Sequence, residues 1–218
     1  MNVVKKLAYK FVISFQFALF AIGAHAETYR VTSSVMEEEG TGLSWDSPMS
    51  LESAITTAQA GDTILLKAGE YDITAQISLD KALTIKGGLA GSDDTTLDPS
   101  GKTTLNAFDR TAFDYIFNVS TDITDATNVF ENICFTRAYR RGVYKSGKSH
   151  IVFRNCRFYR NAVRYLRTAN EDATRDGGGI RLSGGTSSEA YFDSCLFDCN
   201  AHTNFVARNS ALAGAGIY

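Results

Sequence analysis

Arginine and lysine side chains are concentrated in one segment of this 218-residue chain. Residues 132–170 contain ten basic side chains and no acidic one, whereas residues 27–131 contain 18 acidic and 6 basic side chains. Five arginines recur every three or four residues: Arg154, Arg157, Arg160, Arg164 and Arg167. Cations without intervening acids can bind an anionic glycan, a phosphate-rich polymer or an acidic patch of a partner protein. These five arginines are therefore the candidate ligand-binding residues.

The same arginines have a simpler interpretation. They can form a solvated flank whose charges pair with Asp and Glu on neighbouring segments. Their spacing alone would suit one side of a helix, but the strand pattern described below favours outward positions around one turn of β-structure. Nucleic acid is not an expected partner, because the acidic remainder of the surface would repel its phosphate backbone.

Other chemically capable residues are not grouped in a catalytic pattern. Asp93-Asp94 and the acidic residues within 171–176 lie in turn-rich stretches that are typical of surface loops, and no EF-hand spacing is present. His150 flanks an apolar run, His202 lies in a turn, and neither belongs to a Ser-His-Asp or Cys-His set. We expect no catalytic residue, no metal site and no cofactor.

Four cysteines, Cys134, Cys156, Cys195 and Cys199, lack the paired spacing of a zinc site. Cys156 and Cys195 occupy the same place in the repeat described below, so we expect them to stack as small buried side chains. A disulfide bond between them remains an alternative, although stacking in register seldom gives good disulfide geometry.

Residues 1–26 have the parts of a cleavable secretory signal. Lys5, Lys6 and Lys10 precede an apolar run over 11–23, and Ala24-His25-Ala26 is a small-x-small cleavage pattern. That run is too short for a transmembrane helix, which needs about 20 apolar residues. We expect cleavage after Ala26, a mature chain without a transmembrane segment, and a location outside the cell, at its surface or at the outer membrane.

The mature sequence predicts one short helix followed by many short strands. Ser47-Pro48 suits a helix start, and an apolar face formed by Leu51, Ala54, Ile55 and Ala58 predicts a helix over 48–59. Short apolar runs separated by Gly, Asp, Asn and Ser then indicate strands. These runs are 63–66, 77–79, 83–85, 115–119, 129–135, 151–158, 180–182 and 190–197.

The second half of the chain repeats itself. Residues 153–162 (FRNCRFYRNA) match residues 192–201 (FDSCLFDCNA) 39 positions later, and a weaker copy begins at Phe130. Such repeats predict a parallel β-helix, in which each coil buries its inward residues only when another coil stacks on it. We expect Phe158 to stack on Phe197 and Asn161 to form a polar ladder with Asn200.

Two motifs carry a resemblance to known families. FxxN at 158–161 and 197–200, paired with GG-small-Ile at 177–180 and 214–217, resembles the polymorphic outer-membrane protein repeat of secreted right-handed β-helices. The stretch 44–71 resembles the N-terminal cap and first coil of pectin-lyase-like surface proteins. The resemblance implies export, surface display and often adhesion or glycan contact, but it implies no single chemistry.

We therefore predict an all-β right-handed parallel β-helix with a signal peptide (1–26), a lead-in with a capping helix (27–62) and stacked coils (63–218). The predicted function is a non-catalytic scaffold for adhesion or for binding a glycan or surface protein. The alternative is a polysaccharide lyase or glycoside hydrolase whose catalytic coils are absent or degenerate. Because residues 214–218 match the opening of a repeat, we also expect the natural chain to continue past Tyr218.

Overall fold

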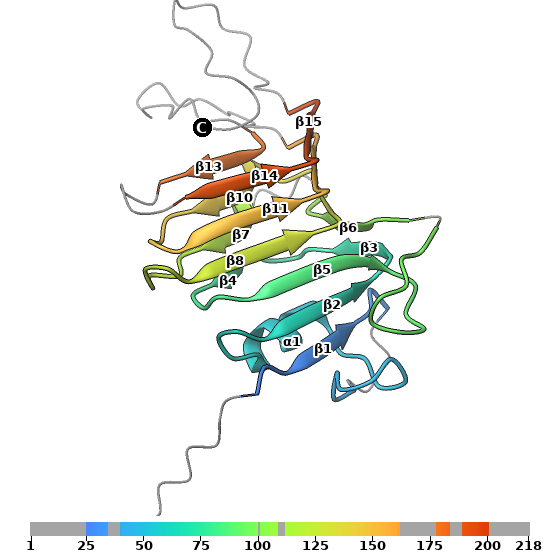
Figure 1. The fold of residues 1–218 in the computed structure, drawn as a ribbon. Helices are drawn as coiled ribbons and strands as arrows, with labels where there is room; N and C mark the ends of the chain where they lie inside the picture. Colours follow the sequence, from blue (N-terminus) through green and yellow to red (C-terminus); the bar gives the residue numbers. More distant parts are fainter. Residues whose placement is uncertain are drawn as a thin grey trace, which may run out of the picture.

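Three parallel sheets run the length of a stack of coils (Figure 1). The computed structural model describes residues 25–34, 40–99, 101–108, 112–161, 178–183 and 189–200. The predicted signal peptide, apart from His25 and Ala26, therefore lies outside the described residues.

Sheet A comprises β1 (Thr28–Val31), β2 (Thr63–Lys67), β5 (Thr84–Leu89), β8 (Thr127–Glu131), β11 (His150–Arg154) and β14 (Ala190–Asp193). Sheet B comprises β3 (Gly69–Asp72), β6 (Thr103–Asn106), β9 (Ile133–Thr136), β12 (Arg157–Tyr159) and β15 (Leu196–Asp198). Sheet C comprises β4 (Ile77–Leu79), β7 (Tyr115–Val119), β10 (Arg141–Lys145) and β13 (Ile180–Leu182). The chain passes from A to B to C in each coil, which is the predicted right-handed parallel β-helix.

Inward side chains alternate along each strand and stack from coil to coil. Ile151, Phe153, Cys156 and Phe158 are all buried, as the alternation predicts. Phe158 stacks on Phe197 with ring centroids 4.8 Å apart and ring planes 8° apart, which confirms the predicted aromatic stack. A second column, Phe130–Phe153–Phe192, is also stacked. Two columns of phenylalanine therefore form a large part of the core from β8 onward.

In the later coils, the turns from sheet A to sheet B and from sheet B to sheet C each contain a non-glycine residue in the left-handed region. These residues are Asn132, Asn155 and Ser194 in the first turn and Phe108, Arg137, Arg160 and Cys199 in the second. Next to the second turn, the buried Asn161 donates from Nδ2 to the Phe135 carbonyl and accepts at Oδ1 from the Ala138 backbone N–H. Its Nδ2 also donates to Asn200 Oδ1, which confirms the predicted asparagine ladder.

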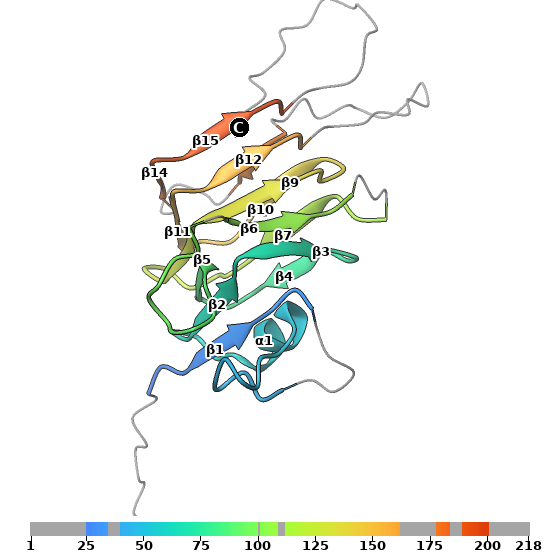
Figure 2. The same cartoon turned by 90° about the vertical axis from the view of Figure 1, so that its right-hand side faces the viewer.

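The helix α1 (Leu51–Thr57) is shorter than predicted and begins later. Ser50, not Ser47, caps it, because the Ser50 hydroxyl accepts a hydrogen bond from Ser53 N while the 47–49 segment forms bridges with other segments instead. The predicted apolar face is nevertheless buried throughout. The helix lies beside β1 at the end of the stack where the coils begin (Figures 1 and 2).

Four strands were not predicted: β1, β3, β6 and β10. β6 and β10 contain polar or charged residues at positions that the stack buries, including Thr103, Arg141 and Lys145. The sequences of β6 and β10 contain too few apolar residues to indicate a strand by themselves. Pairing with strands on both sides determines their conformation.

Candidate functional site

The five candidate arginines do not all lie on one face. Arg154 is exposed on sheet A, Arg157 faces outward from β12 on sheet B, and Arg160 occupies the turn that follows β12. Arg164 and Arg167 lie outside the described residues. For the first three, the outward positions predicted from the strand pattern are correct.

Arg157 and Arg160 meet at the ring of Tyr159. The Cζ atoms of the two arginines lie 4.2 Å and 5.3 Å from the ring centroid, respectively. Strand alternation places Arg157 and Tyr159 on the same outer face, and the positive φ of Arg160 turns the chain so that its side chain returns toward the ring. A guanidinium over an aromatic face gains about 0.5–1 kcal/mol at an exposed site. Tyr159 therefore orders two cations side by side.

One coil earlier, Arg137 occupies the same turn position as Arg160. Thr136 pairs with Tyr159 in register, and the next residues, Arg137 and Arg160, have φ of 55° and 54°. Arg137 Cζ lies 5.2 Å from the centroid of the Phe108 ring. We call Arg137, Arg157, Tyr159 and Arg160 the arginine–tyrosine cluster. Sequence reasoning did not select Arg137, although aligning FTR at 135–137 with FYR at 158–160 would have found it.

An acid from the next coil partly balances the cluster. Arg157 donates to Asp198 Oδ2 at 2.6 Å, and both side chains are about one-third exposed. Hydrogen bonds from the Cys199 thiol and from Arg157 hold the pKa of Asp198 below its usual value. Among the described residues, the cluster thus brings the guanidinium groups of Arg137, Arg157 and Arg160 together with the carboxylate of Asp198.

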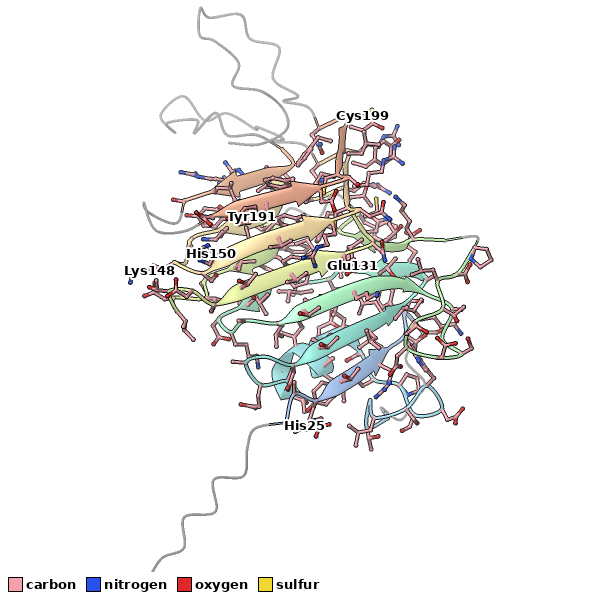
Figure 3. The ribbon with its side chains drawn as sticks, in the orientation of Figure 1. His25, Glu131, Lys148, His150, Tyr191 and Cys199 are labelled. Atoms are coloured by element: carbon pink, nitrogen blue, oxygen red, sulfur yellow. The ribbon has the colours of Figure 1, made fainter. Side chains whose placement is uncertain are left out.

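Several other members of the basic segment are paired with acids from neighbouring segments. Arg154 lies in register between Glu131 on β8 and Asp193 on β14. Arg140 Nε is 3.1 Å from Asp114 Oδ1, and Lys148 Nζ is 3.1 Å from Asp122 Oδ1. Figure 3 shows Lys148 and His150 at the edge where the strands of sheet A begin, and Glu131 at the other edge. This is the arrangement expected of a solvated flank.

Two further cations of the segment face inward. Arg141 and Lys145, at the two ends of β10, are each 1% exposed. Arg141 Cζ lies 5.6 Å from the centroid of the Tyr115 ring, and Lys145 Nζ donates to the Gly147 carbonyl at 2.6 Å. Neither side chain is accessible to an external ligand.

The acidic pair Asp93-Asp94 holds a loop against the first coil. Asp94 accepts from Arg30 and, at 3.0 Å, from Trp45 Nε1. Asp93 accepts from the Thr95 and Thr96 backbone N–H groups in a turn. The hydrogen bonds from Thr96 and from Arg30 lower the pKa values of Asp93 and Asp94, respectively.

His150 lies near two carboxylates, 3.9 Å from Asp125 and 3.8 Å from Glu189. His202 and the acidic residues of 171–176 lie outside the described residues. Within the described ranges, no three His, Cys, Asp or Glu side chains are grouped so that they could hold a metal ion. In the same ranges, no helix is long and apolar enough to cross a membrane.

No protein-family model and no curated protein sequence matches the chain. Among solved structures, the crystal structure of pectate lyase Pel9A is similar, with a TM-score of 0.50 and 18% sequence identity. The match covers 79% of this chain and 48% of the lyase, so the chain corresponds to about half the length of that protein. The likeness defines the class of fold, a parallel β-helix of the pectin-lyase type.

Proposed function

We propose that this protein is exported and displayed as a non-catalytic β-helix scaffold that binds an anionic glycan. The arginine–tyrosine cluster carries the proposal, because it holds three guanidinium groups on the outside of the solenoid at adjacent coils. Arg164 and Arg167 of the predicted site follow the cluster in the sequence and belong to the proposed binding residues, whereas Arg154 lies between two acids on sheet A.

The cluster has the chemistry that an acidic sugar polymer needs. Guanidinium groups present planar pairs of N–H donors that match carboxylate and sulfate oxygens. Neighbouring strands are about 4.8 Å apart, so Arg137 and Arg160 repeat the same donor at a regular interval along the stack. The aromatic rings restrict the arginine rotamers, which reduces the entropy lost when a ligand binds.

Binding to a heparin-like or polyuronate resin at low salt tests the proposal. Wild-type protein should be retained and should elute as salt rises, because exposed charges are screened. Charge reversal at Arg157, Arg160 and Arg164 should abolish retention. The matched control reverses Lys86, Arg140 and Lys148, which changes net charge equally but leaves the cluster intact. No retention of the wild type, or equal loss in both variants, would contradict the proposal.

Substitution of Tyr159 tests the role of the ring itself. Tyr159→Phe should retain binding, whereas Tyr159→Ala should weaken it about 2- to 5-fold, as expected for loss of an exposed cation–π contact. Equal affinities for the two variants would show that the ring does not order the arginines.

A polysaccharide-active enzyme is the second candidate, and the similarity to a pectate lyase favours it. The scaffold and the enzyme can be distinguished by incubating the protein with acidic and neutral polysaccharides. Unsaturated products are then detected by ultraviolet absorbance, and new reducing ends are assayed. Released product would replace the scaffold proposal with a lyase or hydrolase. Binding without release supports the scaffold.

A further inference from the structure

Two cysteines stack inside the solenoid at the turn from sheet A to sheet B. Arg157 pairs with Leu196 in register, so the preceding residues, Cys156 and Cys195, occupy the same position on adjacent coils. Ile133 occupies that position one coil earlier. Paired strands lie about 4.8 Å apart, and disulfides join residues whose Cα atoms are about 4.4–6.8 Å apart. The backbone spacing therefore allows a bond between them.

The two side chains have the same orientation. Cys156 Sγ lies 3.4 Å from the Arg154 carbonyl oxygen and 3.5 Å from that of Phe130 on the coil below. Cys195 Sγ lies 3.4 Å from the corresponding oxygens, those of Asp193 and Phe153. The two thiols thus face the same interior column on adjacent coils.

The two thiols differ in access to solvent. Cys156 is 1% exposed, whereas Cys195, on the last described coil, is partly exposed. Interaction with the neighbouring Cys156 thiol lowers the pKa of the Cys195 thiol below its usual value. Interaction with Cys195 and burial raise the pKa of Cys156. Cys195 is therefore the more accessible of the two thiols, and Cys156 is its enclosed neighbour.

We propose that Cys156 and Cys195 form a thiol–disulfide pair that cross-links adjacent coils when the protein meets an external disulfide. The Cys195 thiolate attacks one sulfur of RS–SR, forms a mixed disulfide and releases RS⁻. Cys156 then loses its proton and attacks the Cys195 sulfur, which forms the Cys156–Cys195 bond and releases the second RS⁻. The two protein thiols are oxidised by two electrons, and the external disulfide is reduced to two thiols that take up the two protons.

The cross-link would join residues 39 positions apart in the sequence. It would link the coil of β14 and β15 covalently to the coil of β11 and β12, in addition to the backbone hydrogen bonds between their strands. A bond of this kind stabilises mainly by restricting the unfolded chain. The oxidised protein should therefore resist unfolding more strongly than the reduced protein.

Oxidised glutathione and peptide mapping test the proposal on the full chain. Native reduced protein is incubated with the oxidant, blocked with an alkylating agent and digested with trypsin without reduction. The expected product links peptide 155–157, which contains Cys156, to peptide 182–208. Fragment sequencing must place the bond on Cys195 and not on Cys199, which the same peptide contains. The thermal unfolding midpoint should rise by several degrees and return on reduction.

Variants provide the controls. The Cys199→Ser variant should form the same disulfide, whereas Cys156 should remain a free thiol in the Cys195→Ala variant. Oxidation of the Cys156→Ala variant should stop at a mixed disulfide on Cys195. In the reduced variant, alkylation of Cys195 at pH 7 should be several-fold slower than in the wild type. A native protein that keeps both thiols free in excess oxidant, or that joins Cys195 to Cys199, would overturn the proposal.

Discussion

Lys145 is a basic side chain that faces the interior of the solenoid. It pairs in register with Val119 of the core, and its ammonium group donates to the Gly147 carbonyl. Burial lowers the pKa of Lys145 from its usual 10.5, because the charged form loses hydration. One residue of the basic segment thus opposes folding by its charge while it contributes its aliphatic stem to the core.

Replacement of Lys145 by Met tests this effect through pH. Since the folded state releases the Lys145 proton more readily than the unfolded state, raising the pH favours the folded state until both forms are neutral. The free energy of unfolding of the wild type should therefore increase relative to Lys145→Met as the pH rises toward and through 10.5. Denaturant titrations of both proteins over this range measure the difference. A difference that does not change with pH would show that Lys145 has the same pKa in the folded and unfolded states, as expected for a well-solvated ammonium group.

At the scale of elements, the turn between sheets B and C depends on one asparagine side chain per coil. Asn161 satisfies the Ala138 N–H and the Phe135 carbonyl, and Asn200 satisfies the Phe158 carbonyl in the same way. These backbone groups are separated from water by the stacked coils. The FxxN pattern in the sequence therefore has a direct structural cause, since the asparagine completes the hydrogen bonds of the coil below.

Asn161→Ala leaves two buried backbone groups without their partner. At about 1–3 kcal/mol for each unsatisfied group, the free energy of unfolding should fall by about 2–6 kcal/mol. Ser194→Gly is a suitable control, because Ser194 is exposed, its hydroxyl donates only to the adjacent Asp193, and glycine tolerates its φ of 54°. Urea denaturation of the three proteins gives the comparison. Similar losses for both variants would mean that the ladder does not stabilise the turn.

The helix α1 contributes through its buried face. Ile55, which is 7% exposed, faces the core beside β1, so Ile55→Asp exchanges apolar contact for a buried carboxylate. The expected loss is several kcal/mol, whereas Thr57→Asp on the exposed side should change stability by less than about 0.5 kcal/mol. Thermal unfolding of the two variants is the measurement. An unchanged midpoint for Ile55→Asp would show that the helix does not cover the first coil.

At the scale of the whole molecule, the predicted cleavage point coincides with a contact of the first coil. The Glu27 backbone N–H donates to Asp62 Oδ1 at 2.8 Å, and Asp62 is 3% exposed. Asp62 Oδ2 also accepts from Gln59 N. Cleavage after Ala26 would turn the Glu27 nitrogen into an ammonium group opposite this carboxylate, and the hydrogen bond would become an ion pair.

Intact-mass analysis of exported protein should show Glu27 as the first residue. Asp62→Asn should then destabilise a chain that begins at Glu27 by about 1–2 kcal/mol more than a chain that keeps residues 1–26, because only the former has an ammonium group at this position. Membrane-bound mature protein that retains Met1 would refute the cleavage. Equal effects of Asp62→Asn in both chains would refute the ion pair.

The sequence by itself determined the repeating part of this protein. The apolar strand pattern and the 39-residue repeat predicted the stacked inward residues, the Phe158–Phe197 stack and the asparagine ladder. They could do so because, within the repeat, inward positions such as those of Phe158 and Phe197 are occupied by the same kind of side chain in successive coils. The apolar face of α1 was equally evident, but its start was misplaced, because Ser47-Pro48 is held by bridges that no helix signal reveals.

Only the tertiary structure determined which charged side chains pair with one another and which are buried. The segment from 132 to 170 contains no acid, yet Glu131 and Asp193 lie beside Arg154, and Asp198 pairs with Arg157. The strands of a β-helix bring together residues that are one coil apart in the sequence, so a local count of charge does not describe the surface. The same stacking buries Lys145 and places Arg137 next to Arg160, because register, and not sequence distance, sets the neighbours of each side chain.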